Sequence, residues 1–103
     1  MNGLSYEFKG SGEELTVSCS GKLNTNTVPE LTEEMQKRID GVKSLTIDLA
    51  GLEYMSSAGL RLVVELQKSM TKCGGKMVLR HVNDEVMDVF ELTGLSHVLK
   101  IEA

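Results

Sequence analysis

The segment from residue 45 to residue 80 restricts the fold most, because it predicts a strand, a helix and a second strand in immediate succession. Residues 45–49 and 76–80 are short apolar runs rich in β-forming residues. Between them, apolar residues recur at helical spacing at Leu62, Val63, Leu66, Met70 and Cys73. A strand–helix–strand unit joins parallel strands by a right-handed crossover, so the sequence predicts an α/β protein.

The first forty residues predict a hairpin followed by a helix. Residues 4–9 and 14–20 favour two short strands, and the second alternates apolar and polar residues, which is typical of a strand with one solvated face. Thr27-x-x-Glu30 has the spacing of a capping box. We therefore expect an amphipathic helix that begins near Thr27 and ends near residues 40–41.

The end of the chain predicts a third helix over residues 84–92, capped by Asn83. Leu99 and Ile101 form a last short strand or simply hold the tail in place. Together these segments predict one domain over residues 1–103. Its expected fold is a mixed β-sheet of about four to five strands with helices packed mainly on one face.

Charge and composition exclude several partners. The formal net charge of -4 gives no basic surface for nucleic acid or for an anionic membrane. With only four aromatic residues, the chain lacks a platform for stacking bases or sugars. Neither a signal segment nor a membrane-spanning run is evident, so we expect a cytoplasmic protein that binds no membrane and no nucleic acid.

The residues that most often carry chemistry are sparse. Cys19 and Cys73 are isolated and are interpreted as core thiols, and His81 and His97 lack metal-ligand spacing and are expected at the solvated surface. We therefore predict no metal, no cofactor and no enzymatic activity. A Ser-His-Asp arrangement that uses Ser57 stays open from the sequence alone, although no nucleophile elbow is present.

The stretch from Asp48 to Arg61 is the strongest candidate site. The strand over 45–49 is expected to leave through a loop containing Gly51 and to present Ser56 and Ser57 where the long helix begins. A helix start has unpaired N–H groups and the positive end of the dipole, so it accommodates an anion, including a phosphate on its own serine. Either serine could instead simply cap the helix, which contributes about 1 kcal/mol.

The first turn of this helix, Ala58-Gly59, carries no acidic residue. Glycine inside a helix costs about 1 kcal/mol relative to alanine, so something other than helix propensity favours it here. We interpret the small, uncharged turn as a surface that a partner can approach.

Several motifs extend this pattern over almost the whole chain: Asp48-Leu49-Ala50-Gly51-Leu52, Tyr54-Met55-Ser56-Ser57-Ala58-Gly59-Leu60-Arg61, Gly74-Gly75, Met77-Val78-Leu79 and Val89-Phe90-Glu91-Leu92-Thr93-Gly94-Leu95. In this combination the chain resembles the STAS domain family, and within it the bacterial anti-sigma factor antagonists, also called anti-anti-sigma factors. Gly21-Lys22-Leu23-Asn24 is similar to the Gly-x-Leu-Asp segment of the family, with Asn24 in place of aspartate.

The resemblance implies regulation of transcription by partner switching. In such proteins the unphosphorylated form binds an anti-sigma factor, which is also a serine kinase of the histidine-kinase-like ATPase fold, and frees a sigma factor. Phosphorylation of a serine abolishes this binding, and a PP2C-type phosphatase removes the phosphate. The family pattern Asp-Ser-Ser/Thr-Gly, aligned on Gly59, implies Ser57 as the acceptor, with Ser56 in the place of the aspartate and as the alternative acceptor.

The resemblance also implies a partner-binding surface, for which Met55 and Leu60 are candidate exposed apolar anchors. Two alternatives remain: a STAS subunit of a lipid-transport or sensory signalling complex, in which the serines only cap the helix, and a small-ligand or nucleotide-binding protein. The predicted partner-binding residues are Asn24, Met55, Ser56, Ser57, Ala58, Gly59, Leu60 and Arg61.

Overall fold

The computed structural model describes residues 3–10 and 12–102, and within them it contains five strands, three α-helices and one short 3-10 helix. Their order along the chain is β1 (Leu4–Lys9), β2 (Glu14–Leu23), α1 (Val28–Arg38), β3 (Ser44–Met55), α2 (Ser57–Lys72), β4 (Lys76–Arg80), α3 (Asp84–Leu92), η1 (Leu95–His97) and β5 (Ile101–Glu102).

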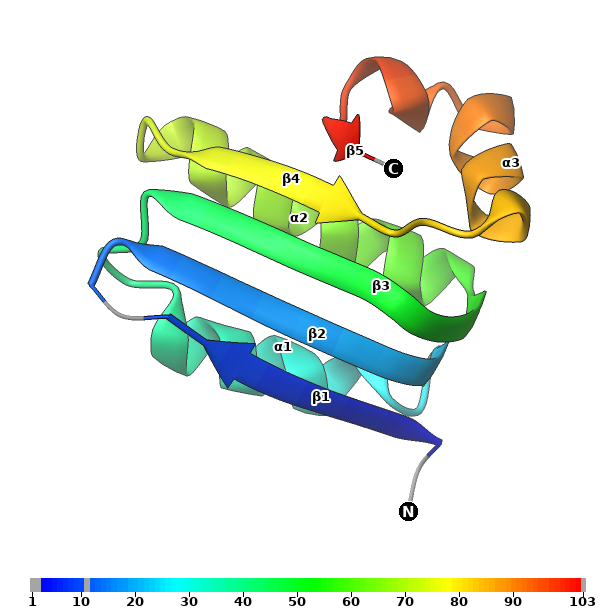
Figure 1. The fold of residues 1–103 in the computed structure, drawn as a ribbon, viewed down its shortest axis with the longest axis horizontal. Coiled ribbons are helices and arrows are strands. Elements are labelled where there is room, and N and C mark those ends of the chain that lie inside the picture. The colour runs from blue at the N-terminus through cyan, green and yellow to red at the C-terminus, as the bar shows by residue number, and fades with distance from the viewer. Residues whose placement is uncertain (1–2, 11, 103) are drawn as a thin grey trace.

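The strands form one mixed sheet in the order β1-β2-β3-β4-β5. β1 and β2 pair antiparallel as a hairpin, and every later pair is parallel. Figure 1 shows α1 and α2 side by side on one face of this sheet, while α3 lies at the β5 edge. The predicted α/β fold, with helices mainly on one face, is confirmed. Of the two possibilities for the tail, the short last strand is the one observed.

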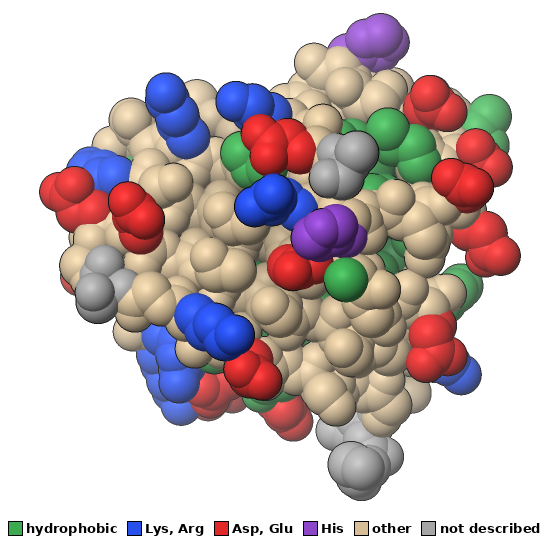
Figure 2. All heavy atoms as spheres, viewed as in Figure 1, with side chains coloured by type: hydrophobic (Ala, Val, Ile, Leu, Met, Phe, Trp, Pro, Cys, Tyr) green, Lys and Arg blue, Asp and Glu red, His purple; other side chains and the backbone are tan. Residues whose placement is uncertain are grey.

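Most of the core lies between the sheet and the pair α1 and α2, and the buried residues Val86 and Phe90 of α3 extend it. Strand residues that point toward the helices are almost fully buried, as are the residues of α2 that face them; they include Val17, Leu45, Leu49, Leu79, Val63 and Met70. The opposite face of the sheet is covered by none of the helices in residues 3–10 and 12–102, and it carries mainly polar residues (Figure 2). The strands therefore have one apolar and one solvated side, as the alternation in the sequence predicts.

The carboxyl-terminal ends of β2 and β3 are longer than predicted. β2 continues beyond Ser20 to Leu23, and β3 continues beyond Leu49 to Met55, so the expected loop around Gly51 is wrong. The two extensions pair with each other through two register irregularities. Gly51 lies against Ser20 so closely that a Cβ atom would clash with that side chain. The glycine thus permits close strand pairing and does not mark a loop.

The capping box predicted for α1 is also wrong, although the helix begins where expected. Thr27 makes no side-chain capping contact. Its buried hydroxyl instead donates to the Lys22 carbonyl at 2.8 Å and accepts from the Asn24 N–H at 2.9 Å. Thr27 therefore stabilises the turn between β2 and α1. The predicted cap of α3 is confirmed, because Asn83 Oδ1 accepts from the Val86 N–H at 2.9 Å.

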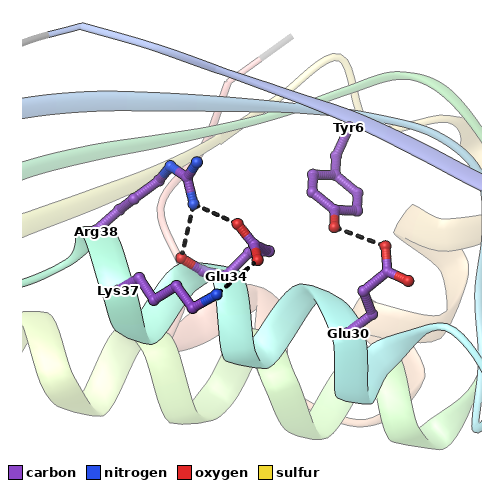
Figure 3. A network of polar contacts seen from close by, with 5 residues as sticks. All are labelled: Tyr6, Glu30, Glu34, Lys37 and Arg38. Carbon is purple, nitrogen blue, oxygen red and sulfur yellow. Dashed lines mark hydrogen bonds and ion pairs between the residues drawn. The ribbon is translucent and has the colours of Figure 1, made fainter.

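A polar network joins the edge strand β1 to α1 (Figure 3). Tyr6 donates to Glu30 at 2.7 Å, and this hydrogen bond is the main reason that the pKa of Tyr6 is raised to about 12. Glu34 contacts Arg38 at 2.6 Å and Lys37 at 3.2 Å, and these bonds lower its pKa. The Arg38 guanidinium also lies 4.2 Å from the centre of the Phe8 ring. Side chains of α1 thereby stabilise the position of the outermost strand.

The two cysteines differ from each other. Cys19 is buried, as expected, and burial together with the charge of Asp48 raises its pKa to about 11. Cys73 is exposed at the end of α2, so the prediction that it is a core residue is wrong.

His81 and His97 are both exposed, as predicted. No helix within the described residues is long and apolar enough to span a membrane.

Candidate functional site

Only Ser56 separates the end of β3 from the start of α2. Its Oγ accepts a hydrogen bond from the Ala58 N–H at 3.2 Å, and its carbonyl accepts one from the Leu60 N–H at 3.0 Å. Its own N–H donates to the Leu23 carbonyl at 2.8 Å. Ser56 is half-buried and has extended backbone angles, which are those of an N-cap residue. Its hydroxyl is therefore already used to cap the helix.

Ser57 is the first residue of α2 and is exposed. Within the part of the chain that the structure describes, its hydroxyl makes no hydrogen bond. The first turn contains no acidic residue. Of the two serines, Ser57 is thus the one with an accessible hydroxyl, and the unpaired N–H groups nearby favour negative charge.

The structure brings Asn24 next to these serines. Leu23 pairs with Met55 across β2 and β3, so Asn24 and Ser56 follow directly after paired residues. Asn24 Oδ1 accepts from the Asn26 N–H at 2.9 Å and the Thr27 N–H at 3.0 Å. A carboxylate oxygen at this position could accept the same two bonds. Asparagine therefore keeps the geometry of the turn but lacks the charge.

Two of the predicted contact residues point into the protein. Met55 is 8% exposed, so the expectation that it is an exposed anchor is wrong. Gly59 is buried, and a Cβ atom there would lie 2.7 Å from Met55 Cγ and 3.1 Å from Leu23 Cβ. The glycine allows the start of α2 to pack directly onto the ends of β2 and β3. Its place in the first turn therefore has a packing reason, which the sequence did not reveal.

The remaining predicted residues of the helix start differ in exposure. Leu60, the second candidate for an exposed anchor, is only half-exposed and packs against the core. Ala58 is half-buried and Arg61 is exposed. A groove of about 330 Å³ between α1 and α2 begins here, lined by Thr25, Val28, Pro29, Thr32, Ala58, Arg61, Leu62 and Glu65. Ala58 and Arg61, which follow Ser57 on α2, thus form part of the wall of this groove.

Tyr54 belongs to this region but was not among the predicted contact residues. It is 52% exposed, although it is large and mostly apolar. A register irregularity between β2 and β3 leaves both Glu53 and Tyr54 exposed between the buried residues Leu52 and Met55. Regular alternation ends at Leu49, so the sequence offered no local signal for the side on which Tyr54 lies. Exposed tyrosines are frequent in protein interfaces.

A second polar pair lies on the open face of the sheet. His81 Nδ1 is 2.9 Å from Asp48 Oδ1, and His81 adopts the left-handed backbone conformation with φ 58°. Partial burial raises the pKa of Asp48, but the contact with His81 and the hydrogen bond from the Ala50 N–H outweigh it, and the net effect lowers this pKa. Asp48 lies about 20 Å from Met55 along β3. The pair therefore supplies no base to Ser57, and the Ser-His-Asp alternative fails on geometry.

Comparison with known proteins identifies the family of this fold and site. The family model described as the STAS domain matches residues 5–103. The chain belongs to the STAS domain family. It is 33% identical over 99 residues to the anti-sigma-B factor antagonist of Staphylococcus aureus, a match that covers 95% of this chain and 92% of that protein.

The described residues contain no group of three His, Cys, Asp or Glu side chains placed to hold a metal ion.

Solved structures of other STAS proteins share the fold. The anti-sigma factor antagonist SpoIIAA in its unphosphorylated form is similar with a TM-score of 0.83 and 19% identity, covering 96% of this chain and 89% of that one. The phosphorylated form of SpoIIAA from Bacillus is similar with a TM-score of 0.77 and 18% identity, covering 96% and 92%. At these identities the likeness concerns the fold, which confirms the predicted STAS-like sheet.

Proposed function

We propose that this STAS protein is a cytoplasmic, non-catalytic anti-sigma factor antagonist that is switched by phosphorylation of Ser57. In its unphosphorylated form it binds an anti-sigma factor and thereby frees a sigma factor. In its phosphorylated form it releases that partner. The relatives named anti-sigma factor antagonist support the class of function, since one of them matches almost the whole chain.

The different hydrogen bonding of the two serine hydroxyls supports Ser57 as the phosphate acceptor. Ser56 Oγ is engaged with the Ala58 N–H, whereas Ser57 is exposed and its hydroxyl makes no hydrogen bond in the described part of the chain. A kinase needs a hydroxyl that it can reach without first unfolding a helix cap. Ser57 meets this requirement and Ser56 does not.

The phosphate donor and its removal follow from the same proposal. The anti-sigma factor acts as the kinase, with the histidine-kinase-like ATPase fold, and transfers the γ-phosphoryl group of ATP to Ser57 Oγ. ADP leaves, and the hydroxyl proton is lost. A PP2C-type phosphatase hydrolyses the phosphoserine and restores the binding form.

A phosphate at this position can abolish binding without a change of fold. It adds a charge of about -1.5 to -2, which the start of α2 tolerates. The same charge disfavours any interface packed against the first turn. Each 1.4 kcal/mol or so lost at the interface lowers affinity about tenfold, so a few kcal/mol suffice for a switch.

The decisive experiment is incubation of the protein with ATP and the histidine-kinase-like anti-sigma factor of the same organism, followed by mapping of phosphate by mass spectrometry. We expect phosphate on Ser57 in the wild type and in Ser56→Ala, and none in Ser57→Ala. Ser57→Asp is expected to bind the anti-sigma factor about tenfold more weakly than wild type or worse.

Ser56→Ala is the matched control, because it removes the neighbouring hydroxyl and costs only the helix cap. Phosphate found on Ser56 alone would contradict the assignment of Ser57 as the acceptor but would still support regulation by phosphorylation. An absence of phosphate with every such kinase, together with wild-type binding by Ser57→Asp, would contradict the proposal and favour a STAS subunit that is not phosphorylated.

A further inference from the structure

Arg61 is an exposed cation close to the proposed phosphorylation site. It lies four residues after Ser57 on α2, so the two side chains are neighbours on one side of the helix. The ion pairs found among the described residues do not include Arg61, although Glu65 follows it by one further turn. Arg61 is thus available to a negatively charged group.

Arg61 has no acidic neighbour on its N-terminal side in the unmodified helix. It is the fifth residue of α2, and the first turn before it contains no acid. The pair Arg61 and Glu65 has the less favourable order, with the base before the acid. An acid at position 57 and a base at position 61 have the favourable order. A phosphate on Ser57 would supply that acid.

We propose that the phosphate on Ser57 pairs with Arg61 of the same helix and thereby withdraws Arg61 from the surface that binds the anti-sigma factor. This inference rests on the proposed function, because it specifies how the phosphorylated state differs from the unmodified one. In the unmodified protein, Arg61 at the mouth of the groove between α1 and α2 pairs with an acidic group of the anti-sigma factor. Phosphorylation both adds negative charge and removes this positive contact.

Phosphate and guanidinium are well matched for such a pair. The guanidinium group offers a planar set of donors to the phosphate oxygens, and the doubly charged phosphate attracts it more strongly than a carboxylate does. Lysine at the same position would keep the charge but lose the two-pronged geometry. Arg61→Lys should therefore behave as an intermediate between wild type and Arg61→Gln.

The first experiment tests the pair without any kinase. Protein synthesised with phosphoserine at position 57 is titrated and followed by ³¹P NMR, in the wild-type background and in Arg61→Gln. A neighbouring guanidinium favours the dianion, so we expect the second pKa of the phosphate to be lower with Arg61 than with glutamine by about 0.3 units or more. Equal pKa values in the two proteins would overturn the proposal.

The second experiment measures affinity for the anti-sigma factor. Unphosphorylated Arg61→Gln should bind about three- to tenfold more weakly than wild type, and its affinity should fall by a smaller factor when position 57 is phosphorylated. Lys68→Gln is the matched control, an exposed cation on the same helix roughly 16 Å further along the axis from Ser57. It should bind within about twofold of wild type. Wild-type affinity of Arg61→Gln would overturn the proposal.

The two failures can be told apart. If phosphorylated wild type binds the anti-sigma factor as tightly as unmodified wild type, the proposed function fails, whatever Arg61 does. If phosphorylation weakens binding by the same factor in wild type and in Arg61→Gln, the switch stands and the role of Arg61 is wrong.

Discussion

Helices α2 and α3 are both preceded by a residue whose side chain caps the helix, yet their first turns differ. At α3, Asn83 caps the helix, and Asp84 and Glu85 follow it in the first turn. At α2, Ser56 caps the helix, and no acid follows. The third helical residue is a buried valine in α3 and a buried glycine in α2.

The difference shows which helix start is arranged for stability. Acids in the first turn of α3 interact favourably with the helix dipole, by about 0.3–1 kcal/mol each. The start of α2 lacks this contribution and has glycine where the sheet ends press closest. The first turn of α2 is therefore uncharged and compact. One added negative charge changes the local charge more there than in the first turn of α3, which already carries two acids.

The largest expected effect comes from filling the space at Gly59. Gly59→Val should lower the free energy of unfolding by about 3 kcal/mol, because the side chain would clash with Met55 and Leu23. Urea denaturation measures this loss. Ala58→Val, which places the same side chain one residue earlier at a half-exposed position, should cost less than about 1 kcal/mol. Equal stability of Gly59→Val and wild type would remove the packing explanation for the glycine.

Removal of the two caps should have unequal effects. Asn83 caps α3, and its Nδ2 also donates to the Leu52 carbonyl at 2.9 Å, so Asn83→Ala should cost about 2 kcal/mol. Ser56 makes a single capping bond of 3.2 Å, so Ser56→Ala should cost about 1 kcal/mol or less. Denaturation of both variants under identical conditions makes the comparison. A larger loss for Ser56→Ala would mean that its hydroxyl has a further structural role.

Lowering the pH should weaken the contact between Asp48 and His81, which lies in the segment that leads from β4 to α3. Because the pKa of Asp48 is lowered in the folded state, its contribution is complete above the unfolded value of 3.8 and is lost as the pH falls through the lower folded value. We expect less than about 1 kcal/mol. Between pH 5 and about pH 3, the protection factors of amides near His81, which are corrected for the intrinsic exchange rate at each pH, should fall more in wild type than in Asp48→Asn. Identical pH dependence in the two proteins would contradict this assignment.

The smallest expected effect is an exchange of charge between the two helix starts. Ala58→Glu should raise the free energy of unfolding by about 0.5 kcal/mol, and Glu85→Gln should lower it by a similar amount. Only Ala58→Glu should weaken binding to the anti-sigma factor, since only this variant places the new charge beside Ser57 in the first turn of α2. Loss of affinity in Glu85→Gln as well would extend the partner surface to α3.

Most of the fold followed from local patterns. The alternation in β2 and the helical spacing in α2 specify which side chains are inward without reference to distant residues, and the cap at Asn83 is equally local. The ends of β2 and β3 were predicted too short, because their pairing depends on contacts such as Gly51 with Ser20. Local glycine and turn signals cannot reveal a partner strand.

The candidate site was predictable in position but not in orientation. The sequence pattern placed Ser57 at a helix start, and the family resemblance added Asn24 to the partner-binding residues; the structure brings the two to the same end of the sheet. That Met55 and Gly59 point inward and Tyr54 outward depends on how far β3 extends and on the register irregularities in its pairing with β2. The contact between Asp48 and His81 joins residues 33 positions apart and has no local signal.

The single-residue connection between β3 and α2 has a consequence for how the length of this protein can vary. One inserted residue after Met55 would rotate α2 by about 100° relative to the sheet, because each helical residue turns the chain by that angle. Gly59 would then leave the close contact with Leu23, and Ser57 would face a different direction. Gly12 and Gly41 lie in exposed turns, and a Cβ atom at either glycine would meet no other atom within 4 Å. Insertions and deletions should therefore accumulate at that end of the molecule, while the length of the connection at Ser56 stays fixed.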